Sequence, residues 1–288
     1  MEDLESKKYW IWLSLIKNLG SKRKLKLLNL YKNPEEIYKL TKEELMNING
    51  IGETTANEII ISKNEKILNY HIKYMKENNI KIININEEKY PKILKEIYDP
   101  PISLYVKGNT EKLNNKNIGI VGCRECTEYG KNVAEYFSYN LSKQNINIVS
   151  GLAKGIDSYA HLGSLYNGNT IAVLGNGLDM IYPKENLELA NEIIKRGGTI
   201  ISEYPCGTKP DKMKFPARNR IISGISKGVI VVEAKEKSGT LITVDFALEQ
   251  GRDVFVVPGN INSINSVGTN DLIKQGARLV TTYEDVIL

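Results

Sequence analysis

Positive charge is concentrated in one short segment of the chain. Five cations lie between Lys209 and Arg220, with Asp211 as the one anion among them: Lys209, Lys212, Lys214, Arg218 and Arg220. The rest of residues 117–288 offsets this excess, so the net charge of +5 resides in residues 1–116. A basic segment within an otherwise neutral region favours a local anion site over a generally adhesive surface.

Turns built from small residues accompany this segment, and each follows a short apolar run. They are Gly122-Cys123-Arg124, Ser150–Asp157, Gly175–Asp179, Ser202–Pro205, Ser238-Gly239-Thr240 after Glu233, and Pro258–Asn260. Glycine allows the backbone to approach a phosphate closely, and amides at a helix N-terminus can donate to it. Six such turns at one edge of a sheet would suit a phosphate-rich ligand.

The elements that must position these turns alternate regularly from residue 117 onward. Strand-length apolar runs occur at 118–121, 146–149, 170–174, 199–202, 229–232 and 254–257, with helical stretches at 128–144, 155–166, 184–196, 216–223 and 240–250. This alternation predicts an α/β fold, a Rossmann-like, doubly wound and mostly parallel sheet over residues 117–288. Ligands of such folds lie beyond the carboxyl ends of the strands, where the turns fall.

The N-terminal region has a different pattern. Residues 1–65 are typical of a small all-α domain of the SAM or helix-hairpin-helix type, since Gly50-Ile51-Gly52 precedes Ala56 within an apolar run. This hairpin either presents amides to a phosphate or simply joins two helices. Residues 66–116 are expected to form a connector and the start of the core, with a helix over 62–79 and a strand at 81–85.

We expect the strand-end turns and the basic segment to form one site. The candidate DNA- or phosphate-binding residues are Gly122, Arg124, Gly151, Lys154, Gly155, Lys212, Lys214, Phe215, Arg218, Asn219, Arg220, Ser238, Gly239 and Thr240. Asp157, Glu203 and Glu233 are expected to orient the loops. Two alternatives stay open: Phe215 either stacks on a base or anchors the core, and one of Arg218 and Arg220 either binds phosphate or pairs with Glu203 or Glu233.

The sequence lacks the motifs that several kinds of cofactor-binding, catalytic and metal site require. No G-x-G-x-x-G series or Walker GK[ST] occurs, so no cofactor is expected. No G-x-S-x-G nucleophile elbow accompanies His161, so it is not expected to act with a catalytic serine. The three cysteines, Cys123, Cys126 and Cys206, are too few for a structural zinc site of four thiolates, and no metal is expected. The alternative function is a nucleotide-binding or nucleotide-hydrolysing enzyme of a related Rossmann-like family, with Glu203 or Glu233 as the acid–base group.

Longer motifs carry a specific resemblance. Their residues and their order along the chain resemble those of the DprA/Smf family. The motifs are Ile120–Arg124, Ser150–Asp157 with Ala160-His161, Tyr182–Asn186, Ser202–Pro205, Phe215–Arg220, Ser238–Thr243 and Glu249–Arg252 through Pro258–Asn260. The resemblance covers residues 90–288 strongly and the helical region loosely. It implies single-stranded DNA binding without enzymatic activity, a Rossmann-mediated homodimer, and delivery of DNA to the RecA recombinase in natural transformation.

The sequence departs from that family at a few points. Cys123 and Thr127 stand where the family usually has serine, which puts a hydroxyl contact at residue 123 in doubt. The winged-helix domain that many members append at the C-terminus is not expected here. No signal peptide, membrane span or disulfide framework is recognisable, so we expect a cytoplasmic protein that contacts no membrane.

Overall fold

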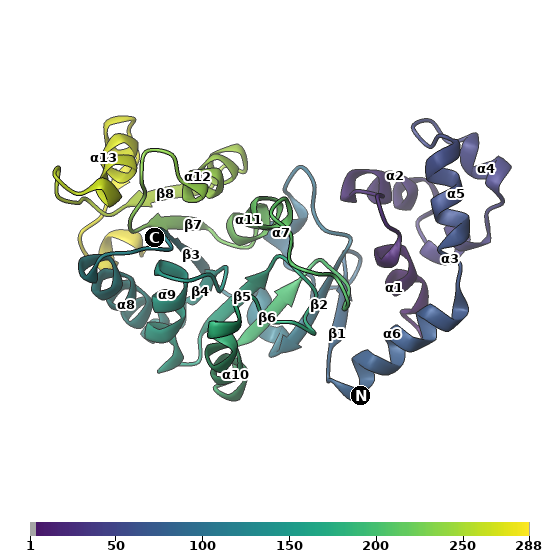
Figure 1. The fold of residues 1–288 in the computed structure, drawn as a ribbon, viewed down its shortest axis with the longest axis horizontal. Coiled ribbons are helices and arrows are strands. Elements are labelled where there is room, and N and C mark those ends of the chain that lie inside the picture. Colours follow the sequence, from purple (N-terminus) through teal and green to yellow (C-terminus); the bar gives the residue numbers. More distant parts are fainter. Residues whose placement is uncertain (1–3, 288) are drawn as a thin grey trace.

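The computed structural model describes residues 4–287, and its centre is one mixed sheet (Figure 1). Within these residues the sheet has nine strands in the order β1-β2-β6-β5-β4-β3-β7-β8-β9. The strands are β1 (Lys81–Asn84), β2 (Ser103–Gly108), β3 (Asn117–Val121), β4 (Asn147–Ser150), β5 (Thr170–Leu174), β6 (Thr199–Ser202), β7 (Gly228–Val231), β8 (Asp253–Val256) and β9 (Arg278–Leu279). Strands β3 to β9 run parallel, whereas β2 is antiparallel to β6 and β1 is antiparallel to β2.

Helices cover both faces of the sheet. One face carries α8 (Glu128–Lys143), α9 (Ile156–Leu165) and α10 (Leu187–Lys195), and the other carries α11 (Lys214–Gly224), α12 (Gly239–Glu249) and α13 (Val267–Lys274), with the short α7 (Lys92–Lys95) beside α11 (Figure 1). The strand order reverses after β6, so β3 lies between β4 and β7. The predicted Rossmann-like, doubly wound α/β fold is therefore confirmed.

The parallel strands form because their apolar runs are buried from both sides. Every residue of β3 and of β5 is buried, including Ile120 and Val173, which are fully inaccessible. Valine and isoleucine suit this position because their branched side chains pack well on a pleated surface. Each of the six strands predicted from apolar runs lies within one residue of its expected bounds.

The N-terminal helices form a bundle beside strands β1 and β2 (Figure 1). They are α1 (Lys8–Leu15), α2 (Ser21–Tyr31), α3 (Pro34–Lys39), α4 (Lys42–Met46), α5 (Glu53–Ile61) and α6 (Glu65–Glu77). Thr41 and Glu44 form a capping box at the start of α4. In the hairpin before α5, Gly50 has a φ of +89°, a conformation that glycine adopts without strain. The predicted helical hairpin is therefore present.

The stretch between the bundle and the Rossmann-like part contributes more than a connector. Strand β2 pairs with β6, so residues 103–108 extend the main sheet. Sequence reasoning did not identify this strand, because Pro100 and Pro101 precede it and Gly108 ends it, so the region was interpreted as an extended, turn-rich connector. The bundle also shares a continuous apolar core with the sheet, in which Trp12, Tyr105 and Ile200 take part.

The remaining short elements are the 3₁₀ helices η1 (Thr110–Asn114), η2 (Lys184–Asn186), η3 (Ile264–Ser266) and η4 (Tyr283–Val286). Across residues 4–287, none of the helices combines the length and apolar character needed to cross a lipid bilayer.

Candidate nucleic-acid interface

The turns after β3 and β4 pack backbone against backbone. Gly155 has a φ of +77°, and a Cβ atom there would lie 2.3 Å from the carbonyl oxygen of Cys123. The amide of Ile156 donates to that same oxygen at 3.1 Å. Glycine is required at residue 155 because any side chain would force the two turns apart.

Arg124 projects from this rigid pair of turns. Its side chain is exposed, and it forms no ion pair with any residue in the described part of the chain. A guanidinium held at the edge of two fixed turns can donate two parallel hydrogen bonds to a phosphate. Arg124 therefore lies exposed at a strand-end turn, and its role as a phosphate ligand stays a prediction.

Arg218 differs from its predicted position. Its side chain is buried, and Nη1 donates to the carbonyl oxygen of Gly151 at 2.6 Å and to that of Val173. Burial lowers the pKa of Arg218 to about 10, although the nearby Asp157 carboxylate acts in the opposite direction. This arginine therefore ties α11 to the ends of β4 and β5 and does not reach a phosphate at the surface.

Asp157 holds the same turn from the other side. Its Oδ2 accepts from the amide of Gly151 at 3.0 Å and from that of Ala153 at 3.3 Å. Burial raises the pKa of this carboxyl group, whereas Arg218 and the two amides lower it. Asp157 is thus placed where a loop-orienting residue should be.

Arg220 is committed to an ion-pair network. Its Nη2 lies 2.6 Å from Oε2 of Glu203, and its Nε lies 3.0 Å from Oδ2 of Asp99. Burial lowers the pKa of Arg220, but Glu203 outweighs that effect and the net shift is upward. Of the two alternatives left open by the sequence, the structure has pairing with Glu203, so the predicted phosphate contact of Arg220 is not available here.

Glu233 joins the turns after β3 and β7, the neighbouring strands at which the sheet order reverses. Its carboxylate accepts from the Thr127 amide at 2.9 Å and from the Thr127 hydroxyl at 2.5 Å. Asn265 approaches the same group at 3.4 Å. A pocket of about 550 Å³ opens beside it, bounded partly by Tyr129 and Asn260. Both carboxylates that were considered for acid–base chemistry, Glu203 and Glu233, thus hold the loops together.

The basic segment forms the loop before α11 and the first turns of that helix. Lys212 is exposed, and Asn219 is half-buried. Lys214 donates to the carbonyl oxygen of Lys209 at 3.0 Å and lies 5.7 Å from the ring centroid of Tyr204. Neither lysine side chain forms an ion pair among the described residues, so both charges remain available to an anion.

Phe215 is half-buried and stacks on Tyr182. Their ring centroids lie 5.4 Å apart with an angle of 24° between the planes. A Cβ atom on Gly175 would lie 2.9 Å from the Phe215 ring, so Phe215 also covers the turn after β5. The sequence analysis named Tyr182 only as part of a motif and gave it no role at the site, because its stacking partner is remote in sequence. Of the two alternatives for Phe215 the structure shows packing, and stacking on a base stays a prediction.

The other candidate residues lie along the same strand-end edge. Lys154 is exposed and pairs with Glu185 at 2.5 Å. Ser238 caps α12, where its hydroxyl accepts from the Thr240 amide at 3.2 Å, and Gly239 is exposed beside it. Gly122 packs so closely on Ile156 that a Cβ atom would lie 2.5 Å from that side chain.

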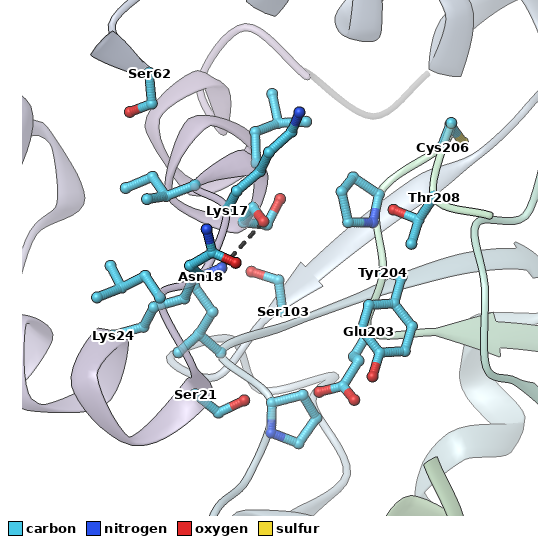
Figure 2. A pocket seen from close by; sticks show the side chains of 18 of the residues that line it. Lys17, Asn18, Ser21, Lys24, Ser62, Ser103, Glu203, Tyr204, Cys206 and Thr208 are labelled. Carbon is cyan, nitrogen blue, oxygen red and sulfur yellow. Dashed lines mark hydrogen bonds between the residues drawn. The ribbon is translucent and has the colours of Figure 1, made fainter. Parts of the chain in front are cut away.

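A second hollow, which sequence reasoning missed, lies between the helical bundle and the sheet (Figure 2). This interdomain cleft has a volume of about 1350 Å³. Residues Lys17, Asn18, Ser21 and Lys24 of the bundle face Glu203, Tyr204 and Thr208 from the loop after β6. Such a site could not be found from local patterns, because its two walls are about 180 residues apart in sequence.

Comparisons with known proteins agree with this architecture. Residues 81–288 match the family described as DNA recombination-mediator protein A, and residues 13–62 match the SAM-like helix-hairpin-helix tandem. The DNA processing protein DprA of Bacillus subtilis is 48% identical over 213 residues, which is 73% of this chain and 71% of that protein. Protein Smf of Escherichia coli is 44% identical over 74% of this chain and 58% of its own length.

Solved structures extend the likeness to the whole chain. The X-ray structure of DprA from Streptococcus pneumoniae superposes with a TM-score of 0.85 at 39% identity, covering 97% of this chain and 96% of that one. DprA from Helicobacter pylori, described for its mode of binding single-stranded DNA, has a TM-score of 0.66 at 33% identity and covers 72% and 94%. The chain is therefore a member of the DNA recombination-mediator protein A family, the DprA/Smf proteins.

Proposed function

We propose that this DNA-processing protein binds single-stranded DNA at the carboxyl-end edge of its sheet. The observation that carries the proposal is the exposed guanidinium of Arg124, which rises from two turns that are locked together through Gly155. Lys212 and Lys214 supply two further charges along the same edge. The relative from Helicobacter pylori, whose structure is described for single-stranded DNA binding, supports this assignment.

The number of available cations sets the expected salt dependence. With Arg218 and Arg220 committed inside the protein, Arg124, Lys212 and Lys214 remain as phosphate ligands. Each phosphate contact on a single strand contributes a slope of about −0.7 in log K against log salt. Three contacts give about −2, so affinity is expected to fall roughly 20-fold between about 50 and 200 mM salt.

Fluorescence anisotropy with labelled oligo-deoxythymidine tests the proposal directly. We expect binding at low salt that weakens as salt rises, and a clear loss of affinity in Arg124→Ala. Glu125→Ala serves as the matched control, because Glu125 is the exposed neighbour on the same turn. Failure of the purified protein to bind unpaired oligonucleotides at low ionic strength would refute the proposal.

The resemblance extends this function to recombination. We infer from the resemblance that a homodimer protects incoming DNA in the cytoplasm and loads RecA onto it; the family description of a recombination mediator supports a role in recombination. Light scattering would report the dimer, and RecA filament growth on coated DNA would report loading. Arg124→Ala should fail in the loading assay if the bound strand is what the protein hands over.

We further propose that the protein acts without catalysing a reaction. Glu203 and Glu233 are occupied by Arg220 and Thr127, which leaves neither carboxylate placed to protonate a leaving group. Incubation with nucleoside monophosphates should therefore release no free base. Measurable base release that disappears in Glu233→Gln would instead favour the nucleotide-hydrolysing alternative.

A further inference from the structure

We infer that the interdomain cleft is a second section of the single-stranded DNA site, which takes up the strand after it leaves the strand-end turns. This inference rests on the proposed function and assigns the helical bundle a share in DNA binding. It concerns the surface formed by α1, α6 and the loop after β6, and not the hairpin before α5.

The cleft is continuous with the strand-end site. Lys209 and Lys214 of the basic segment line it, and Lys214 also belongs to the site proposed above. The loop after β6 leads from Glu203 past Tyr204 to Lys209 along one wall, and the bundle forms the other (Figure 2). A strand held at Lys214 therefore meets the cleft without crossing any other element.

Three tyrosines line the cleft, and Tyr70 is the most exposed of them, whereas Tyr74 and Tyr204 are half-buried. Tyr70 on α6 is 65% exposed, and its ring centroid lies 6.4 Å from that of Tyr74 with 30° between the planes. Tyr204 contributes a third ring from the opposite wall. Tyrosine rings that face an open groove are suited to stacking with unpaired bases, whatever the sequence of the strand.

The charges in the cleft also favour a polyanion. Two of its acidic groups, Glu203 and Asp99, pair with Arg220. The other two accept from neutral amides, Asp179 from Gly207 at 2.9 Å and Glu58 from Asn18 at 2.7 Å, and they keep their charge against the four lysines that line the cleft. Lys17 and Lys209, by contrast, are exposed and form no ion pair with any residue between 4 and 287.

Two buried groups point the same way. The hydroxyl of Ser103 lines the cleft, is almost inaccessible, and lacks a hydrogen-bond partner among the described residues. Lys24 also lines the cleft and donates to the carbonyl oxygen of Ser14 at 3.0 Å, and burial lowers its pKa to about 8. An anion held in the cleft would favour the charged form of Lys24.

Anisotropy with two lengths of oligo-deoxythymidine separates the two sections of the site. We expect Tyr70→Ala to weaken binding of a strand of about 20 nucleotides by roughly 5- to 10-fold, and to leave a strand of about 6 nucleotides unaffected. Tyr70→Phe should bind like the wild type because it keeps the ring. Tyr166→Ala is the matched control, since Tyr166 is also largely exposed, at 77%, and follows the last residue of α9.

Each other result has a definite meaning. Unchanged affinity of Tyr70→Ala for the long strand overturns the inference while leaving the strand-end site intact. Equal losses for both lengths also overturn it, because they would indicate a general change in the protein. Absence of binding by the wild type would refute the proposed function itself.

Photocrosslinking gives an independent readout. A 20-nucleotide strand carrying 5-iododeoxyuridine should crosslink to α6 peptides that contain Tyr70 or Tyr74, as mapped by mass spectrometry. Crosslinks confined to the strand-end turns, with none to Tyr70, Tyr74 or Tyr204, would exclude the cleft as a DNA path and leave it to another occupant, such as a polypeptide.

Discussion

The guanidinium of Arg218 donates to the carbonyl oxygen of Gly151 from beneath the turn that this glycine begins. A Cβ atom on Gly151 would lie 2.4 Å from the same guanidinium, so any side chain at residue 151 would displace Arg218 from this position. This contact fixes the turn after β4 relative to α11, and the basic segment is held in place by the same helix.

Arg218 is therefore expected to act on stability more than on charge. Arg218→Ala removes the donor for two buried carbonyl groups and leaves a cavity, which should lower the free energy of unfolding by about 3 kcal/mol. Urea unfolding measures this, with exposed Lys212→Ala as a control that should change stability by less than about 0.5 kcal/mol. A fully stable Arg218→Ala whose DNA binding has a flatter salt slope would show that the arginine contacts phosphate after all.

Arg124 and Lys214 should instead control the salt dependence of DNA binding. Each alanine substitution should flatten the slope of log K against log salt by about 0.7, because one phosphate contact is lost. Lys227→Ala is the control, since this exposed lysine precedes β7 at the opposite edge of the sheet. Equal slopes in the wild type and both variants would remove these side chains from the interface.

Glu203 is expected to matter because it balances a buried charge. In Glu203→Gln, Arg220 would keep only the more exposed Asp99 as an ionic partner, and breaking a buried pair in this way costs about 3 kcal/mol. Asp99→Asn should cost less, because the side chain of Asp99 is 32% exposed. Thermal or urea unfolding of both variants checks the order, and a larger loss in Asp99→Asn would contradict it.

His161 should make the protein sensitive to mild acid. The residue is fully buried, and its Nδ1 lies 2.7 Å from the Thr170 hydroxyl, which itself donates to a carbonyl oxygen. Burial lowers the pKa of His161 to about 3, with Arg218 acting in the same direction. His161 therefore binds a proton near pH 6.5 in the unfolded chain, whereas in the folded protein it does so only near pH 3.

Stability should consequently decline as the pH falls below about 6.5. This histidine alone should lower the free energy of unfolding by about 2 kcal/mol between pH 7 and pH 5. His161→Asn will be less stable at neutral pH, but its stability should vary less over that interval, which isolates the contribution of the imidazole. An identical pH dependence in both proteins would mean that His161 titrates normally.

The sequence was sufficient for those parts of the fold that depend on local pattern. The run Thr170–Leu174 was predicted as a strand and is one, because apolar residues bounded by turns have few other buried conformations. The glycines of the hairpin before α5 were likewise readable from the sequence, since they act on their own neighbours.

Side-chain direction was beyond such reasoning. From the spacing, Arg218 and Arg220 were expected at the strand ends. They lie on α11, which begins at Lys214, and both of their side chains are buried. The buried face of this helix mixes arginines with Ile221 and Ile222, so no apolar stripe marked it. The pairing of Arg220 with Glu203 and Asp99 joins three separate segments, which only the folded chain can show.

Strand β2 has a wider consequence for how the protein can be divided. Its pairing with β6 occupies the backbone amides and carbonyls along Thr199–Ser202. In a fragment that lacks the first 108 residues, β6 would become an exposed edge strand, and an exposed edge strand readily pairs with a strand of another molecule. Such a fragment should therefore aggregate, so the N-terminal third of the chain also protects the remainder from self-association.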